Sequence, residues 1–237
     1  MTVKFAEQCR AAAAERSKNL RSQADRPSQR RDGADATAVA RAHARITEFS
    51  FREETTEAGV SVLRFDGYAS ITDTPYEMYD WYGPYMETVE AGAFTKTLKT
   101  LGLDVPLVLQ HNDLRRIART TAGSLRLEED TRGLRVEADL NPNDTDVQYI
   151  RQKIDDRLID EMSFKFRITE GWWSDDFDEF VIKEVDIHRG DVAIVGYGAN
   201  PHTAGATIKA PERADGAPTL KRGSDLITNE DVALRFI

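Results

Sequence analysis

The clearest alternation of apolar and polar residues falls on residues 160–167, which run Asp-Glu-Met-Ser-Phe-Lys-Phe-Arg. Successive side chains of an extended strand point to opposite faces, so this segment predicts a strand with one apolar and one polar face. The apolar face carries Met162, Phe164 and Phe166. The polar face carries Ser163, Lys165 and Arg167. Such a strand would hold Ser163 on a rigid element, as a nucleophile is held, but an ordinary half-buried strand has the same pattern.

The remaining pattern predicts further strands and two helices. Alternation or short apolar runs predict strands within 46–68 and at 105–111, 123–128, 133–140, 180–187 and 192–195. Apolar residues at helical spacing predict helices over 91–101 and 144–158. Tyr, Pro and Gly are concentrated in residues 73–87, which predicts an irregular loop. We therefore expect a mostly β domain with two or three helices over residues 46–210.

Both ends of the chain differ from this central region. Residues 1–45 contain twelve Ala and almost no large apolar residue after Phe5. Because no apolar stripe is available for burial, we expect a disordered or transiently helical basic extension here. Residues 211–237 are mostly polar and are expected to form a C-terminal tail that could dock to a partner.

The net charge of −9 is unevenly distributed. Residues 1–45 carry ten Lys or Arg and five Asp or Glu, whereas the remainder carries 22 basic and 36 acidic residues. An acidic body argues against nucleic acid as the main partner. No run approaches the roughly 18 apolar residues that span a membrane, and the N-terminus has no apolar stretch typical of a secretory signal. Cys9 is the only cysteine, so an internal disulfide and a Cys-based zinc site are excluded, which suits a reducing cytoplasm.

A nucleophilic serine needs a base, because its hydroxyl reacts poorly until a neighbouring imidazole accepts the proton. The histidines stand at positions 43, 111, 188 and 202. His111 lies where the predicted strand 105–111 meets a turn, and it is the candidate base. His43 falls in the N-terminal extension and His202 follows Asn-Pro in an expected exposed loop, so we set both aside.

A Ser–His pair also requires a group that orients the imidazole. Asp191 is a candidate, because it introduces a charge into the apolar strand around 192–195, where a charge needs a partner. His188, three residues earlier, is the alternative.

Two other chemistries use the same residues. Lys165 lies two positions after Ser163 on the same predicted face, so a Ser–Lys dyad is conceivable. His111 and Asp113 could serve as ligands of a metal-dependent hydrolase, although no His-Glu-x-x-His motif accompanies them.

Six segments, in order, resemble those of the prohead (head maturation) proteases of tailed phages, whose fold is related to the herpesvirus assemblins. They are Phe-Asp-Gly-Tyr-Ala at 65–69, Glu-Ala-Gly-Ala-Phe at 90–94, Val-Leu-Gln-His-Asn at 108–112, a hairpin over 122–134, Glu-Met-Ser-Phe-Lys-Phe at 161–166, and Asp-Val-Ala-Ile-Val at 191–195 with Ala-Asn-Pro at 199–201. The resemblance runs from about residue 64 to 206. Two positions depart from the family pattern: Lys165 replaces the usual glycine, and Ala193 replaces a common serine.

This resemblance implies an α+β fold of the assemblin-like type, a small, mostly antiparallel β-barrel flanked by helices. It implies a serine endopeptidase with Ser163 as nucleophile, His111 as base and Asp191 as third member. His188 remains the alternative third member, because assemblins use a second histidine. No cofactor is implied.

The resemblance also implies partners and a location. The expected substrate is the major capsid protein or its scaffolding segment, inside the phage procapsid in the host-cell cytoplasm. Self-cleavage and a homo-oligomer are further implications, and residues 1–45 and 211–237 then become candidate propeptides or capsid-docking segments. The alternative is a non-catalytic capsid-assembly factor that has the protease fold.

Overall fold

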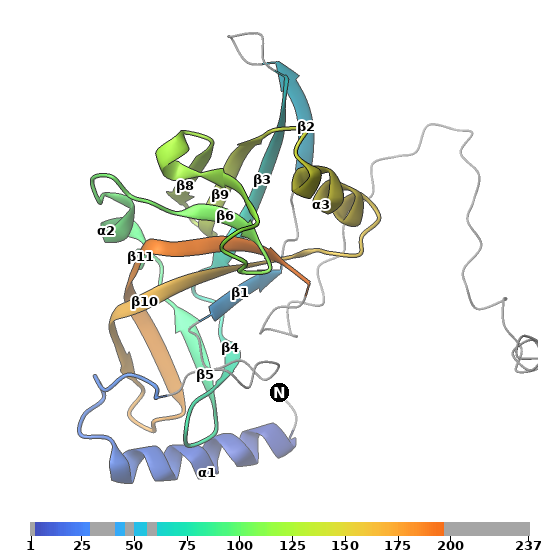
Figure 1. The fold of residues 1–237 in the computed structure, drawn as a ribbon. Coiled ribbons are helices and arrows are strands. Elements are labelled where there is room, and N and C mark those ends of the chain that lie inside the picture. Colours follow the sequence, from blue (N-terminus) through green and yellow to red (C-terminus); the bar gives the residue numbers. More distant parts are fainter. Residues whose placement is uncertain (1–2, 29–40, 46–49, 56–60, 197–237) are drawn as a thin grey trace, which may run out of the picture. The chain divides into compact units, whose positions relative to one another are not determined.

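The computed structural model describes residues 3–28, 41–45, 50–55 and 61–196, and the strands in these ranges form two sheets (Figure 1). One sheet is seven-stranded and is built around the two longest strands, β10 (Glu161–Trp173) and β11 (Glu179–Val195). The other sheet is antiparallel and has the strand order β2 (Ser50–Thr55), β3 (Ser61–Ile71), β9 (Gly133–Leu140) and β8 (Leu125–Glu129).

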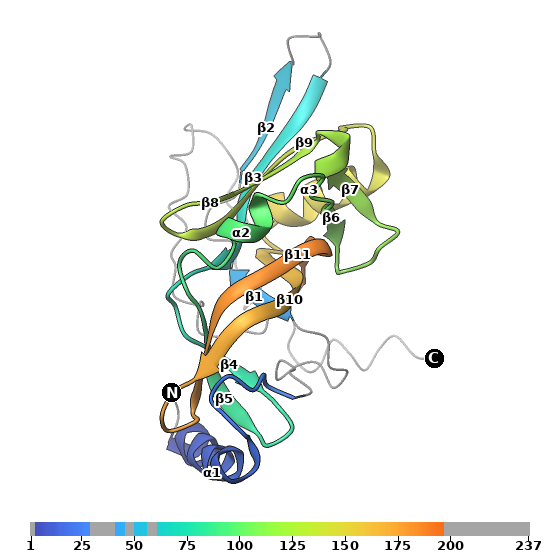
Figure 2. The same cartoon turned by 90° about the vertical axis from the view of Figure 1, so that its left-hand side faces the viewer.

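The antiparallel pair β10–β11 organises the seven-stranded sheet, and Figure 2 shows the two strands side by side along their length. The other edge of β10 pairs with β1 (Arg41–Arg45) in antiparallel orientation. The other edge of β11 pairs with β5 (Pro84–Val89) near its start and with β6 (Pro106–Leu109) near its end, both parallel. β4 (Tyr76–Tyr79) lies outside β5, and β7 (Arg116–Arg119) lies outside β6.

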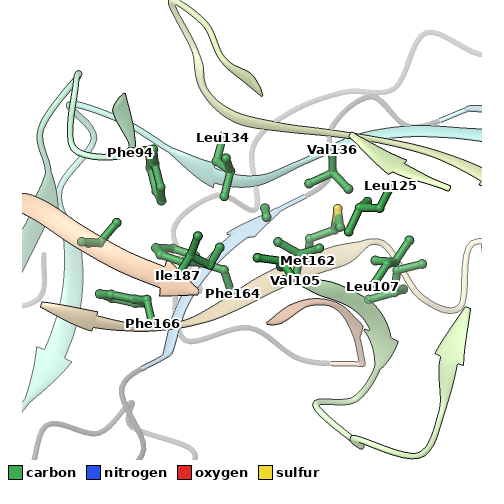
Figure 3. Close-up of a cluster of buried hydrophobic side chains, with 14 of the residues drawn as sticks. Phe94, Val105, Leu107, Leu125, Leu134, Val136, Met162, Phe164, Phe166 and Ile187 are labelled. Atoms are coloured by element: carbon green, nitrogen blue, oxygen red, sulfur yellow. The ribbon is translucent and has the colours of Figure 1, made fainter. Parts of the chain in front are cut away.

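The core lies between the two sheets (Figure 3). Met162 and Phe164 on β10 are fully buried, and Figure 3 shows them facing Leu134 and Val136 of β9. Phe164 also stacks on Phe166, with ring centroids 4.2 Å apart. The predicted apolar face of this strand is therefore confirmed, and burial of each such side chain contributes about 1.5–3 kcal/mol.

The two predicted helices have different outcomes. α3 (Thr145–Asp155) is confirmed: Asp144 accepts hydrogen bonds from the N–H groups of Asp146 and Val147 at the N-cap, and the apolar stripe faces the core. α2 (Thr95–Leu98) is much shorter than the helix expected over 91–101. Gly92 has a φ of 96°, outside the helical region, so the chain turns before the helix begins. A 3₁₀ turn, η1 (Thr120–Ala122), precedes β8.

One loop prediction and one pair of strand predictions were wrong. Residues 73–87 are not an irregular loop but contain β4 and part of β5. Asp80 makes the tight turn between them by accepting hydrogen bonds from the N–H groups of Tyr82 and Gly83. The strands expected at 180–187 and 192–195 are a single strand, β11, interrupted by an irregularity.

A mostly β fold with some helices is confirmed, but a closed barrel is not found in the described ranges. There the strands form two sheets that no strand pairing joins. The seven-stranded sheet is also mixed rather than antiparallel. Its parallel pairs arise because the crossover through α2 returns the chain to the same edge of β11 in the same direction.

The N-terminal segment differs from the expected disordered or transiently helical extension. Residues Val3–Asn19 form α1, which lies beside the β4–β5 hairpin in both ribbon views (Figures 1 and 2). Its buried side chains are Phe5, Cys9, Ala12, Ala13 and Arg16. This stripe is made mainly of small residues, so the usual amphipathic pattern is weak although the face is buried. The expected tail at 211–237 lies outside the described residues.

The centre of the α1 interface is the Arg16 guanidinium, which is fully buried. It donates two hydrogen bonds of 2.9 Å to the Asp80 carboxylate. It also donates to the backbone carbonyls of Gly83, Pro84 and Phe177. These bonds connect the β4–β5 turn with the turn between β10 and β11, so α1 is an integral part of the fold. No helix in the described ranges is long and apolar enough to cross a membrane.

Candidate active site

Ser163 lies near the start of β10, which is flanked by β1 and β11 in the seven-stranded sheet. Its neighbours across the sheet are Ala193 of β11 and His43 of β1. The residue is fully buried, and its side chain projects from the face opposite Met162 and Phe164. The two flanking strands and the core therefore hold the Ser163 backbone in one place, as the alternating sequence predicts.

His111 lies in the turn that follows β6. Gln110 and His111 both adopt left-handed backbone conformations, with φ of 54° and 53°. Non-glycine residues rarely adopt this conformation, and it persists where the surroundings hold it in place. The Gln110 N–H donates to the Ile194 carbonyl at 2.9 Å, and the Gln110 side-chain oxygen accepts from the Gly196 N–H at 3.0 Å. These bonds attach the His111 turn to the end of β11.

The far side of the same turn is attached to α3. The Arg115 guanidinium donates to the Asp146 carboxylate at 2.6 Å and lies over the Tyr149 ring. The Arg115 N–H donates to the Asn112 carbonyl, which closes the turn. The bond to Arg115 and the charge of its guanidinium hold the pKa of Asp146 below its ordinary value. The imidazole of His111 is therefore positioned from two sides.

Three of the predicted site residues are brought together in a hydrogen-bonded series. The Nε2 atom of His111 lies 2.9 Å from Ser163 Oγ, and the Nδ1 atom lies 2.6 Å from Asp191 Oδ1. The side chains of His111 and Asp191 are 4% and 1% exposed. At these distances Asp191 Oδ1 can accept a hydrogen bond from the protonated Nδ1, which leaves Nε2 unprotonated as the acceptor that faces the serine hydroxyl.

The second oxygen of Asp191, Oδ2, is buried and has no hydrogen-bond partner within the described part of the chain. A buried carboxylate oxygen without a hydrogen bond lowers the free energy of unfolding, so Asp191 reduces the stability of the fold. This favours a role beyond packing for Asp191, because such costs are concentrated at functional sites.

His188, the alternative third member, lies elsewhere. Lys165 of β10 pairs with Asp191 of β11, and Arg167, two residues later, pairs with Asp186. Between these two pairs β11 therefore advances by five residues while β10 advances by two. The extra residues form a bulge that includes His188. There the His188 Nδ1 accepts a hydrogen bond of 3.2 Å from the Asp104 N–H. His188 is therefore fixed by the loop that precedes β6 and not by His111.

The other sequence candidates are separated from this series. Lys165 is partly exposed, and its side chain makes no hydrogen bond or ion pair with any described residue. Asp113 is exposed, and its carbonyl accepts from Arg116. No cluster of three or more His, Cys, Asp or Glu side chains suited to a metal occurs within the ranges that the structure describes.

Sequence reasoning missed two features of the site. We set His43 aside as part of a tail, yet its backbone pairs directly with Ser163, although its side chain lies outside the described part. The alternation in 41–45 involves only Ala, Arg and His and carries little strand signal. The role of Gln110 was also missed, because a left-handed conformation at glutamine has no sequence signature.

A serine, an imidazole and a carboxylate bonded in this order form the arrangement that serine hydrolases use. The sequence model of one protein family, described as caudovirus prohead serine protease, matches residues 48–215 and so includes Ser163, His111 and Asp191. The match covers more than half of the chain, and the chain belongs to this family of serine peptidases of the phage prohead. The family expected from the sequence motifs is thereby confirmed. Comparisons with curated proteins and with solved structures found no match.

Proposed function

We propose that this chain is the serine endopeptidase of phage head maturation and that Ser163, His111 and Asp191 perform the reaction. The observation that carries the proposal is the series Ser163 Oγ–His111 Nε2 and His111 Nδ1–Asp191 Oδ1, at 2.9 and 2.6 Å. Three residues that are 52 and 28 positions apart in sequence meet at hydrogen-bond distance on strands and a turn that hold each of them.

In the proposed reaction, Ser163 Oγ attacks the carbonyl carbon of the scissile peptide bond while His111 Nε2 accepts the hydroxyl proton. The Asp191 carboxylate holds the Nδ1–H tautomer and stabilises the imidazolium that forms. His111 then donates the proton to the leaving amine, which gives an acyl-enzyme and a new N-terminus. Water attacks the ester with His111 again as base, which releases the new C-terminus and restores Ser163.

The reacting groups are buried, which has two consequences for this proposal. Exclusion of water strengthens the interaction between Asp191 and the imidazolium. Access of a polypeptide to Ser163 Oγ, however, requires that the site opens. We therefore propose that the described structure corresponds to a closed form of the peptidase.

The proposed substrates are the major capsid protein or its scaffolding segment and the peptidase itself. Family membership supports the capsid and scaffold proteins as substrates. Self-cleavage would act on residues 1–45 or 211–237. For the first of these segments, the buried Arg16 predicts that α1 remains attached after a cut, because α1 belongs to the folded unit.

Co-expression with the coat protein tests the proposal. Wild type is expected to shorten the coat or scaffold protein, and Ser163→Ala and His111→Ala are expected to abolish the cut. Asp113→Asn is the matched control, since Asp113 is exposed next to the same turn. Processing by Ser163→Ala at the wild-type level would contradict the mechanism. Assembly of normal particles without any cleavage by wild type would instead favour the non-catalytic assembly factor.

A further inference from the structure

Lys165 is the residue next to the site that the proposed mechanism does not use. It follows Ser163 by two positions on β10, so both side chains project from the same face of the sheet. Its backbone pairs with Asp191 on β11. Ser163 and Asp191 are buried, whereas Lys165 is only half-buried. Lys165 is therefore the solvent-facing neighbour of the nucleophile on its own strand.

Three other cationic side chains on or beside β10 and β11 have anionic partners. Arg167, the next residue on this face, donates to Asp186. Two lysines on and beside β11 are also paired: Lys183 with Glu90 at 3.1 Å, and Lys96 with Glu184 at 2.9 Å. Lys165 makes no such contact with the described residues. Its register partner, Asp191, uses one carboxylate oxygen for His111, and the other lies beyond ion-pair distance of the Lys165 ammonium.

Lys165 is half-buried as a residue, and its ammonium has no counterion among the described residues. A substrate carboxylate can therefore pair with this ammonium without breaking an existing ion pair. We propose that Lys165 selects substrates with an Asp or Glu side chain within about three residues of the scissile bond, the reach of neighbouring positions on an extended peptide. This inference rests on the proposed peptidase function and specifies its substrate class.

A second role for Lys165 predicts a different result. Through its position opposite Asp191, the positive charge could support the carboxylate that orients His111, as a positioning residue. Removal of the charge would then lower the cleavage rate of every peptide by the same factor and change the pH profile. A specificity role changes the rates only for peptides with a charged residue at one subsite.

The experiment uses the full chain and a library of peptides derived from a bacterial proteome, with the cut sites identified by mass spectrometry. For wild type we expect Asp or Glu to be enriched at one position beside the cut. Lys165→Glu is expected to replace that preference by Lys or Arg at the same position, and Lys165→Gly to remove it. Lys99→Glu, which makes the same charge change at an exposed site directly after α2, should keep the wild-type profile.

A pair of peptides taken from the best site, with Glu or Gln at the selected position, gives the magnitude. In wild type we expect kcat/KM for the Glu peptide to exceed that for the Gln peptide by about fivefold to thirtyfold, which is equivalent to about one or two kcal/mol. In Lys165→Glu we expect kcat/KM for the Glu peptide to be equal to or lower than that for the Gln peptide. An acidic preference that persists in Lys165→Glu, or no acidic preference in an active wild type, overturns the inference. No cleavage by wild type, or equal cleavage by Ser163→Ala, overturns the proposed function and this inference with it.

Discussion

Gly190 of β11 lies against the backbone carbonyl of Lys165 on β10, so closely that a Cβ at position 190 would stand 1.8 Å from the Lys165 oxygen. Only glycine permits this approach. It occurs at the end of the β11 bulge, directly before Asp191. The close approach therefore helps to fix the position of Asp191 opposite the strand that carries Ser163.

We predict that Gly190→Ala separates β10 from β11 at this point. The variant should lose at least about 2–3 kcal/mol of unfolding free energy and most of its peptidase activity, because the clash is with backbone and cannot be relieved by a side-chain rotation. Urea unfolding and coat-protein cleavage measure the two effects. Gly102→Ala is the control: Gly102 has a φ of 69° but open space around it, so a cost of only about 1 kcal/mol is expected. Equal stability of the two variants would contradict the packing argument.

Asp191→Asn tests the third member of the proposed series. The amide keeps the shape of the carboxylate but favours the wrong tautomer of His111, so kcat should fall by about 10³–10⁴-fold. His188→Ala is the matched comparison, because His188 binds the Asp104 N–H and not the His111 ring. We expect its kcat to remain within a few-fold of wild type. If kcat fell further in His188→Ala than in Asp191→Asn, His188 and not Asp191 would be the third member.

Arg16→Ala tests whether α1 is part of the fold. The substitution leaves the Asp80 carboxylate, which is 1% exposed, without its cationic partner. Removal of one partner of a buried pair typically costs about 3–5 kcal/mol, and we expect a loss of this size in chemical unfolding. Arg10→Ala, on the exposed side of the same helix, should change stability by less than about 0.5 kcal/mol. A loss below about 1 kcal/mol for Arg16→Ala would show that α1 contributes little.

Cys9 reports on the same interface through its reactivity. Burial raises the pKa of its thiol to about 11, so the reactive thiolate is scarce at pH 8 and the sulfur is covered by the interface. We expect slow reaction of the native chain with a disulfide reagent at pH 8 and fast reaction after unfolding. Arg16→Ala should accelerate the reaction, since α1 then leaves the surface more often. Rapid labelling of the native wild type would contradict a stably docked helix.

The same pKa shift predicts a loss of stability at alkaline pH. The folded state favours the neutral thiol, so its contribution is complete below the ordinary pKa of 9.0 and is lost as the pH rises through about 11. Comparison of Cys9→Ala with wild type between pH 8 and 11 isolates this effect. The unfolding free energy of wild type should fall more steeply than that of the variant.

The local sequence determined the elements that carry the strongest periodicity. The alternation of 160–167 predicted which face of β10 is buried, because a strand with large apolar side chains on one side has only one stable orientation against a core. The spacing of Val147, Ile150 and Ile154 predicted α3 for the same reason. Residue types and their order, together with the family resemblance, also indicated Ser163, His111 and Asp191 as the candidate series.

Only the tertiary structure decided the features that depend on long-range contacts. The choice of Asp191 over His188 as the neighbour of His111 follows from a bulge, which arises from the approach of Gly190 to Lys165 and has no local sequence pattern. The burial of α1 depends on Arg16 meeting Asp80, 64 residues away, and its stripe of alanines gives a weak periodic signal. The pairing of β1 with the Ser163 strand likewise rests on backbone hydrogen bonds, to which every residue type contributes alike.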